Sequence, residues 1–410
     1  MSMSVAALRR GPGPATLNPA EARERSIRRR VNAVWGLLYL NTLVFEPGSV
    51  LKIPSDVGKL ITQGALPLAI LVALTINPKI RVRPNVFLCL VSLLVLDTAI
   101  TTAEADHIGT VYRTFRLAEF VFALWLLTPW WGRSDMLLLR CHLRWTLLAL
   151  GSVAVGLLVA PDHALGEQAG RLSGVVWPMG PTQVAQYAAV AIGIMVLLWL
   201  GRLMSGRIAL ISVVLITPIL LLTHTRTALA ALAAGILVAG LSLFTVNARV
   251  RKLFAVGTVV VSIGVATAAS FLTNWLARGE NAQGLATLTG RTNFWALVVS
   301  QPRTPFELLF GFGLSNASVD GLPIDSNWFA SYMMEGIFGV IVCAMILVWL
   351  FTNSFFQPRR VQRALALFFI TYGLVASFTE VGFTDVSTYL LNLVVAASLL
   401  VVPFSRNRTT

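Results

Sequence analysis

The sequence predicts an all-α protein that crosses a membrane about twelve times, and its composition is the first reason for this prediction. Hydrophobic residues make up 56% of the 410 residues, and only 12% are charged. Soluble proteins carry about 25% charged residues, and a soluble fold of this length cannot bury so much apolar surface. We therefore expect lipid to be the solvent for most of the chain.

The predicted membrane helices are apolar runs near the length of roughly 20 residues that spans about 30 Å of hydrocarbon. They are expected at residues 31–45, 57–76, 85–102, 108–128, 143–160, 183–203, 207–223, 225–245, 253–272, 328–351, 364–378 and 384–402. Residues 1–30 hold seven arginines and no apolar run, so they predict a basic, disordered cytoplasmic arm and no cleavable signal peptide.

The basic residues predict the orientation of these helices. If the N-terminus is cytoplasmic, every inner loop is basic, whereas outer loops carry acids such as Glu104 and Asp106. Both termini are then cytoplasmic, including the tail at 405–410. The net charge of +14 is accounted for by this topology and by contact with anionic membrane lipids, so nucleic acid is not an expected partner.

One predicted outer loop, residues 273–327, is much longer than the others. It separates helices one to nine, within 31–272, from helices ten to twelve, within 328–404. Loops longer than about 12–15 residues are usually functional or disordered, so we expect this one to form a substrate-binding or catalytic segment. The chain has no evident internal repeat, which disfavours a transporter built from repeats.

Two arginines fall inside a predicted membrane helix, where the orientation rule does not explain them. Arg113 and Arg116 are three residues apart and share one face of the helix at 108–128. A central arginine costs at least about 2.5–3.5 kcal/mol to insert. The pair therefore predicts an anion site, or alternatively a salt bridge to Glu119 combined with snorkelling.

A third arginine begins the predicted eighth helix. Arg226 lies among Thr223, Thr225 and Thr227 in a very short outer turn. The first turn of a helix has unpaired N–H groups and a partial positive charge, so hydroxyls and a guanidinium there can form a phosphate-binding site. The alternative is an ordinary capped helix with a snorkelling arginine.

Arg171 and Arg291 lie in predicted outer loops, where each alone is expected to be solvated. Together with the other outer arginines they suggest a diphosphate ligand, because guanidinium groups bind phosphate oxygens bidentately. Asp325 and Glu335 follow the long loop and are candidates for a general base. Each is equally readable as a helix cap or a packing acid.

No pattern in the sequence predicts a cofactor or a metal. The four histidines and three cysteines have no metal-ligand spacing, and His142 is expected to be cytoplasmic. A glycine-rich nucleotide loop and an aspartate-rich metal motif are both absent from the sequence.

Six short motifs follow one another along the chain, at residues 170–174, 225–228, 290–292, 311–313, 325–329 and 335–339. In this order they resemble the motifs of the O-antigen ligase and O-antigen polymerase superfamily. The resemblance implies a metal-independent glycosyltransferase that uses a polyprenyl-diphosphate-linked glycan, with an acceptor glycan or lipid. It also implies a multi-pass protein of the bacterial cytoplasmic membrane.

The resemblance also implies roles for the outer arginines. By position, Arg226 and Arg291 match the family's diphosphate-binding arginines best, followed by Arg171 and the Arg113/Arg116 pair. These residues would hold the diphosphate of the donor.

The chain departs from the family pattern at one position. The family's ligases usually place a histidine just before the asparagine, and this chain has Ser326 there. The departure favours a polymerase or another branch over a ligase, with Asp325 supplying the base from the adjacent position. The alternative class is a secondary transporter or flippase for an anionic or lipid-linked substrate.

Overall fold

The structure, a computed structural model, describes residues 18–43, 50, 53–104, 108–166, 170–257, 259, 291–314, 318–319, 322–358 and 360–401. The elements in chain order are α1 (Pro19–Asn41), α2 (Ser55–Ile76), α3 (Val86–Glu104), α4 (Ile108–Leu127), η1 (Thr128–Trp130), α5 (Leu137–Val159), α6 (Pro161–Gly166), α7 (Pro181–Leu200), α8 (Gly206–Leu222), α9 (Arg226–Phe244), α12 (Arg291–Ser300), α13 (Pro305–Phe310), β1 (Ser318–Val319), β2 (Leu322–Pro323), α14 (Asn327–Phe356), α15 (Val361–Ala376) and α16 (Thr388–Leu400). The two short strands pair antiparallel.

The predicted helical architecture is confirmed, and several helices suit a membrane protein. Six described helices are long and apolar enough to cross a bilayer, namely α2, α3, α5, α7, α9 and α14. Three more, α8, α15 and α16, are apolar but shorter. Most of the predicted ninth span, 253–272, and much of the loop 273–327 lie outside the described residues. The total of twelve spans and the side of each terminus therefore remain predictions.

Helix α1 begins within the arm that was predicted to be disordered through residue 30. Asn18 precedes the helix, and its side chain accepts a hydrogen bond from the backbone N–H of Ala20. Pro19 occupies the first helical position, where its missing N–H costs nothing. The prediction of disorder was therefore wrong for residues 19–30, which are helical.

An ion-pair network holds this basic end of α1 against the segment before α5. Arg28 and Arg133 both contact Glu24, at 3.0 and 2.6 Å, and both contact Asp135, at 3.0 and 3.1 Å. The hydrogen bond from Arg28, reinforced by Arg133, holds the pKa of Glu24 below its ordinary value. The network explains why this part of the arm is folded despite its net charge.

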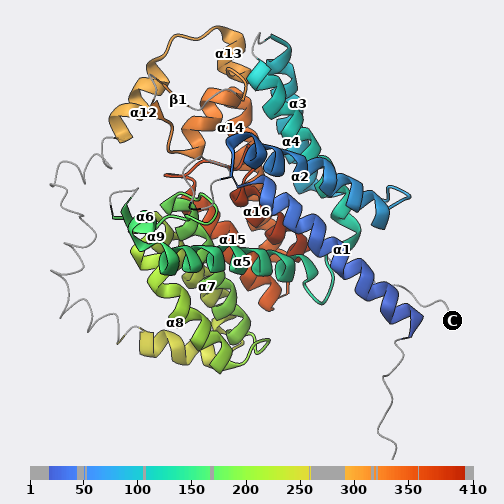
Figure 1. Cartoon of the computed structure of the whole chain (residues 1–410), viewed down its shortest axis with the longest axis vertical. Coiled ribbons are helices and arrows are strands. Elements are labelled where there is room, and N and C mark those ends of the chain that lie inside the picture. Colours follow the sequence, from blue (N-terminus) through green and yellow to red (C-terminus); the bar gives the residue numbers. More distant parts are fainter. Residues whose placement is uncertain are drawn as a thin grey trace, which may run out of the picture.

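Helices α7 and α15 lie in the interior of the bundle, and α15 packs against α9, α16, α14 and α7. Figure 1 shows α7, α8 and α9 on one side of α15 and α16, with α2, α3 and α4 on the other. Phe368 of α15 packs against Gly193 of α7 and Gly235 of α9, where a Cβ atom would overlap its ring. Small residues let membrane helices approach closely, and these glycines fill that role.

Helix α14 is broken at Gly336, which has φ +64 and ψ −160. The carbonyls of Met333 and Met334, just before the break, accept hydrogen bonds from the N–H groups of Phe312 and Gly313 at 2.9 and 2.8 Å. Backbone groups inside a membrane protein need internal partners. The segment after α13 supplies them here, so the motifs at 311–313 and 335–339 form one structural unit.

Candidate functional site

Two arginine-bearing segments that are far apart in the sequence meet at the start of α9. Arg171 donates through Nε to the carbonyl of Thr223 at 3.0 Å and through Nη2 to the hydroxyl of Thr225 at 3.1 Å. The N–H of Leu172 also bonds to the carbonyl of Leu222. Arg171 is therefore fixed on the turn that leads into Arg226, and it is not the freely solvated loop arginine of the alternative interpretation.

The first turn of α9 combines several groups that suit an anion. Thr225 precedes the helix and makes no side-chain cap to its N–H groups. Arg226 is half-buried, and Thr227 shares a hydrogen bond with Thr379 at 2.7 Å. His224 takes a left-handed backbone conformation, φ +49, which makes the turn tight. Helix N–H groups, hydroxyls and guanidinium groups thus gather at one point on the structure.

The segment after α15 connects this turn to the start of α14. Asn327 is fully buried, and its Oδ1 accepts hydrogen bonds from the N–H groups of Gly382 and Phe383 at 3.1 and 2.8 Å. Its own N–H donates to the carbonyl of Ser377. Trp328 donates through Nε1 to the hydroxyl of Ser377 at 3.0 Å. The motif at 325–329 therefore fixes the end of the long loop onto the segment 377–387.

The two candidate bases occupy different environments. Asp325 is exposed, just before α14, whereas Glu335 is 0% exposed at the break in that helix. Eight residues of helix separate Asn327 from Glu335, which corresponds to about 12 Å along the axis. The structure therefore does not bring the two carboxyl groups together as a pair. Which of them acts as a base remains a prediction.

Glu335 lies in α14, which packs against α3, where Asp97 is a second buried acid that the sequence analysis did not select. The charges of Asp97 and Asp385 both act on Glu335. Gly339 leaves the space that the Glu335 side chain occupies, since a Cβ there would lie 2.7 Å from Oε2. The sequence did contain a signal for Asp97. It is an acid within the apolar run of α3, and acids in membrane helices are rare and usually functional.

Arg303, which the sequence analysis did not select, holds the first described part of the long loop against α14. Arg303 donates to the carbonyl of Tyr332 at 2.8 Å, and its guanidinium lies 4.0 Å from the centre of the Tyr332 ring. Trp295 of α12 stacks on Phe329 of α14 with ring centres 4.9 Å apart. These contacts place α12, and so the backbone of Arg291, beside the start of α14. The Arg291 side chain lies outside the described residues.

The intramembrane pair Arg113 and Arg116 lies on α4, apart from the residues at the start of α9 described above. Arg116 donates through Nε to Oδ1 of Asn41 at 3.1 Å and through Nη2 to the carbonyl of Asn41. It therefore caps the end of α1, a partner that neither interpretation of the sequence included. Within the described residues no ion pair joins it to Glu119. A diphosphate-binding role for Arg113 or Arg116 remains a prediction.

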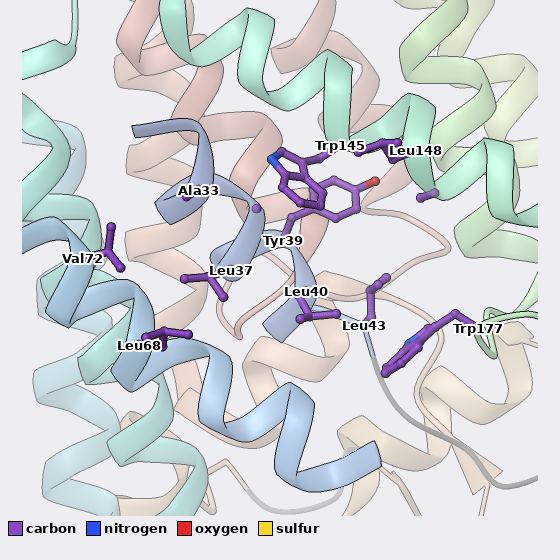
Figure 2. Close-up of a pocket in the computed structure, with 12 residues that line it drawn as sticks. Ala33, Leu37, Tyr39, Leu40, Leu43, Leu68, Val72, Trp145, Leu148 and Trp177 are labelled. Carbon is purple, nitrogen blue, oxygen red and sulfur yellow. The ribbon is translucent and has the colours of Figure 1, made fainter. Parts of the chain in front are cut away.

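An apolar groove runs along α1, α2 and α5, with a volume of about 510 Å³. Tyr39 and Leu40 of α1, Leu43 just after that helix, and Trp145 of α5 form part of its wall. Figure 2 shows Trp177 at the end near Leu43. Trp177 belongs to the tight turn between Gly174 and Met179, which directly follows Arg171. The groove and the Arg171 segment are therefore adjacent parts of one structure.

His142 lies inside the bundle, in a helix and not in the loop before it, and its place on the cytoplasmic side remains a prediction. It is a residue of α5, which begins six residues before the predicted span, at Leu137. The rings of Trp35, Tyr39 and Phe369 surround it edge-on at 5.9 to 6.0 Å. Among the described residues no group of three or more His, Cys, Asp or Glu side chains is arranged to hold a metal ion.

The sequence matches none of the protein-family models and none of the curated proteins with which it was compared. The functional argument therefore rests on the residues and geometry described above.

Proposed function

We propose that this protein is a membrane glycosyltransferase that transfers or polymerises a glycan carried on polyprenyl diphosphate. It would act on the extracytoplasmic face of the bacterial cytoplasmic membrane during synthesis of a cell-surface polysaccharide. The observation that supports this most is the contact between Arg171 and the Thr223–Thr225 turn at the start of α9. The resemblance of the short motifs to the O-antigen ligase and polymerase superfamily points the same way.

The α9 turn suits the diphosphate of such a substrate. Arg171 and Arg226 carry two positive charges, and the N–H groups at the start of α9 add the positive end of the helix dipole. Charge-assisted hydrogen bonds from arginine to phosphate are about twice as strong as neutral ones. The turn therefore has the groups needed to bind the diphosphate and to stabilise the charge that grows on it as it leaves.

The neighbouring groove suits the lipid part of the same substrate. Its wall is formed by aliphatic and aromatic side chains of α1, α2 and α5. A polyprenyl chain is apolar, so it would lie in this groove with its diphosphate near Arg171. Trp177 has the amphipathic side chain that favours the level where membrane and water meet.

The proposed reaction is a nucleophilic displacement at the anomeric carbon of the donor sugar. The hydroxyl oxygen of the acceptor forms the new glycosidic bond. The bond from the anomeric carbon to the diphosphate oxygen breaks, and its electron pair leaves with polyprenyl diphosphate. A carboxylate, Asp325 or Glu335, accepts the hydroxyl proton. By the resemblance, the reaction uses no metal and no cofactor.

The test compares lipid-linked glycans in cells that lack the gene and carry single variants of it. We expect R171A and R226A to accumulate the lipid-linked donor, because the diphosphate loses its charged partners. Each variant should still be present in the membrane at normal levels. R226K should restore part of the activity, since it keeps the charge and loses the bidentate geometry.

R207A is the matched control, because Arg207 is an exposed arginine of α8. It should leave the glycan pool unchanged. Normal glycan in both R171A and R226A would remove these residues from the site. A lipid-linked pool that is unchanged by deletion of the gene would contradict the enzyme itself. Accumulation of single repeat units would indicate a polymerase, and accumulation of finished chains a ligase.

A transporter or flippase for a lipid-linked or anionic substrate is the second candidate. The observation that favours it is the break in α14 at Gly336 beside buried acids, since broken membrane helices often line transport sites. Removal of residues 273–290 from the long loop would distinguish the two classes. The enzyme should lose activity, whereas a transporter should keep moving its substrate.

A further inference from the structure

Two carboxyl groups are buried where α3 packs against the broken helix α14. Glu335 is 0% exposed and Asp97 is 1% exposed. Both belong to helices long and apolar enough to cross a membrane. Within the described part of the chain, none of their four carboxyl oxygens has a hydrogen-bond partner, and neither residue forms an ion pair.

Among the described residues, the charged groups that act on Glu335 are all negative. Two acids act on it, Asp97 from α3 and Asp385 from the segment before α16. The hydroxyls of Ser331 and Thr384 lie near Glu335 but form no hydrogen bond with its carboxyl oxygens, and the Ser331 hydroxyl is paired with the Cys343 thiol at 3.8 Å. No described lysine, arginine or histidine contributes to this environment.

The charged groups on the other elements near the break are engaged elsewhere. The guanidinium of Arg303 is directed to the carbonyl and ring of Tyr332. On α13, Glu307 forms a capping box with Thr304. On α12, the side chain of Arg291 lies outside the described residues. The described cations therefore do not neutralise the two acids.

Thr384 gives independent evidence that something small occupies this position. It is 1% exposed, and its hydroxyl oxygen has no hydrogen-bond partner among the described residues. This hydroxyl lies near Glu335 without a hydrogen bond to it. Buried polar groups nearly always have a partner, so the unpartnered oxygens of Glu335, Asp97 and Thr384 indicate a bound proton, water or ion.

The electrostatics of the two acids favour a bound proton over a water or an ion. A single ionised carboxylate in an apolar interior is strongly disfavoured unless a cation or several donors compensate it. Two carboxylates that repel each other cannot both stay ionised at such a position, so at least one takes up a proton. The protonated carboxyl then becomes a donor that can bond to the other carboxylate or to Thr384.

We propose that Asp97 and Glu335 form a proton-binding site in the membrane interior that holds at least one proton at neutral pH. The proton comes from water and converts one carboxylate to a carboxylic acid, with no other bond made or broken. This site does not depend on the glycosyltransferase proposal. If Glu335 carries the proton, Asp325 is left as the general base of that reaction.

Infrared spectroscopy of the purified full-length protein in lipid nanodiscs tests this site. The variants are D97N, E335Q and the double variant D97N/E335Q, which keep the side-chain shapes. We expect wild-type protein at pH 7 to show a carboxylic-acid C=O band, shifted in D₂O, that the double variant lacks. The band should weaken as the pH is raised and the shared proton is lost.

D325N is the matched control, because it removes an exposed carboxyl group and should leave the band unchanged. If the double variant does not fold, the comparison uses whichever single variant does, which should lose or shift the band. Equal carboxylic-acid bands in wild type and the folded variant at pH 7 would overturn the proposal. Both acids would then be ionised and held by a bound cation instead.

Discussion

At the scale of single residues, the arginines predicted to bind a ligand make different contacts within the protein. Arg171 fixes the turn before α9 through Thr223 and Thr225. Arg116 binds Asn41 at the end of α1. The side-chain amide of Asn41 also donates a hydrogen bond to the carbonyl of Thr62 in α2 at 2.7 Å. An arginine in a membrane helix can therefore be explained by a helix end that needs a donor.

The structural role of Arg116 can be measured by a double-mutant cycle with Asn41. We expect R116Q and N41A each to lower the free energy of unfolding by about 1–2 kcal/mol, because each breaks a buried hydrogen bond to a charged group. The double variant should lose less than the sum, with a coupling of about 1 kcal/mol. Denaturation of the purified protein in detergent gives these values.

Strictly additive losses would show that Arg116 does not act through Asn41. R207A, at an exposed position, should change the unfolding free energy by less than about 0.5 kcal/mol. Lipid-linked glycan levels in R116Q separate the two roles further. Glycan loss without loss of stability would return Arg116 to the ligand-binding residues.

At the scale of elements, the break in α14 is built by two glycines that face each other. Gly311 and Gly336 both have positive φ, +78 and +64. A Cβ on Gly336 would lie 2.6 Å from the backbone nitrogen of Phe310, and one on Gly311 would overlap the backbone of Met334. Only glycine allows this backbone contact, so it also determines where Glu335 lies.

We expect G336A to destabilise the protein by about 2–4 kcal/mol, from backbone strain together with the clash against Phe310. Thermal unfolding in detergent would measure this loss. G64A is the control, because Gly64 lies inside α2 with no atom within 4 Å of a built Cβ. That variant should be neutral or more stable by up to about 1 kcal/mol. Equal stability of G336A and wild type would mean that the break does not need glycine.

At the scale of the whole molecule, the ion-pair network joins the first helix to the segment before α5. Because the Arg28 and Arg133 contacts lower the pKa of Glu24, its ionised form is stabilised by folding. A group of this kind contributes stability above its ordinary pKa of 4.5 and loses it as the pH falls toward the lowered value. The contribution is reduced by solvent because the Glu24 side chain is 39% exposed.

We expect E24Q to be less stable than wild type at pH 7 and in low salt. The difference should shrink as the pH falls below about 4.5, where wild-type Glu24 also becomes uncharged. It should also shrink in high salt, which screens exposed charges. Thermal midpoints measured across pH and salt check both trends, and a difference that is constant with pH would contradict the role of Glu24.

The class of the molecule could be predicted from the sequence alone. Long apolar runs cannot be dissolved in water, so the helical architecture and most helix positions followed from hydrophobic length alone. Local signals also located the start of α9, because Thr225 and Arg226 follow a short polar turn. The sequence shows the motif at 311–313 but does not predict that a helix, α13, ends there. The α1 start at Pro19 was missed because its stabilising partners, Arg133 and Asp135, are remote in sequence.

The contacts between distant residues could be seen only in the packed structure. Arg171 and Thr225 are brought together by the packing of separate segments, and no spacing in the sequence encodes that contact. The same holds for Asp97 and Glu335, whose lack of a described cationic partner became visible only when α3 and α14 were placed side by side. Burial and charge balance are properties of the packed structure, and a linear pattern cannot specify them.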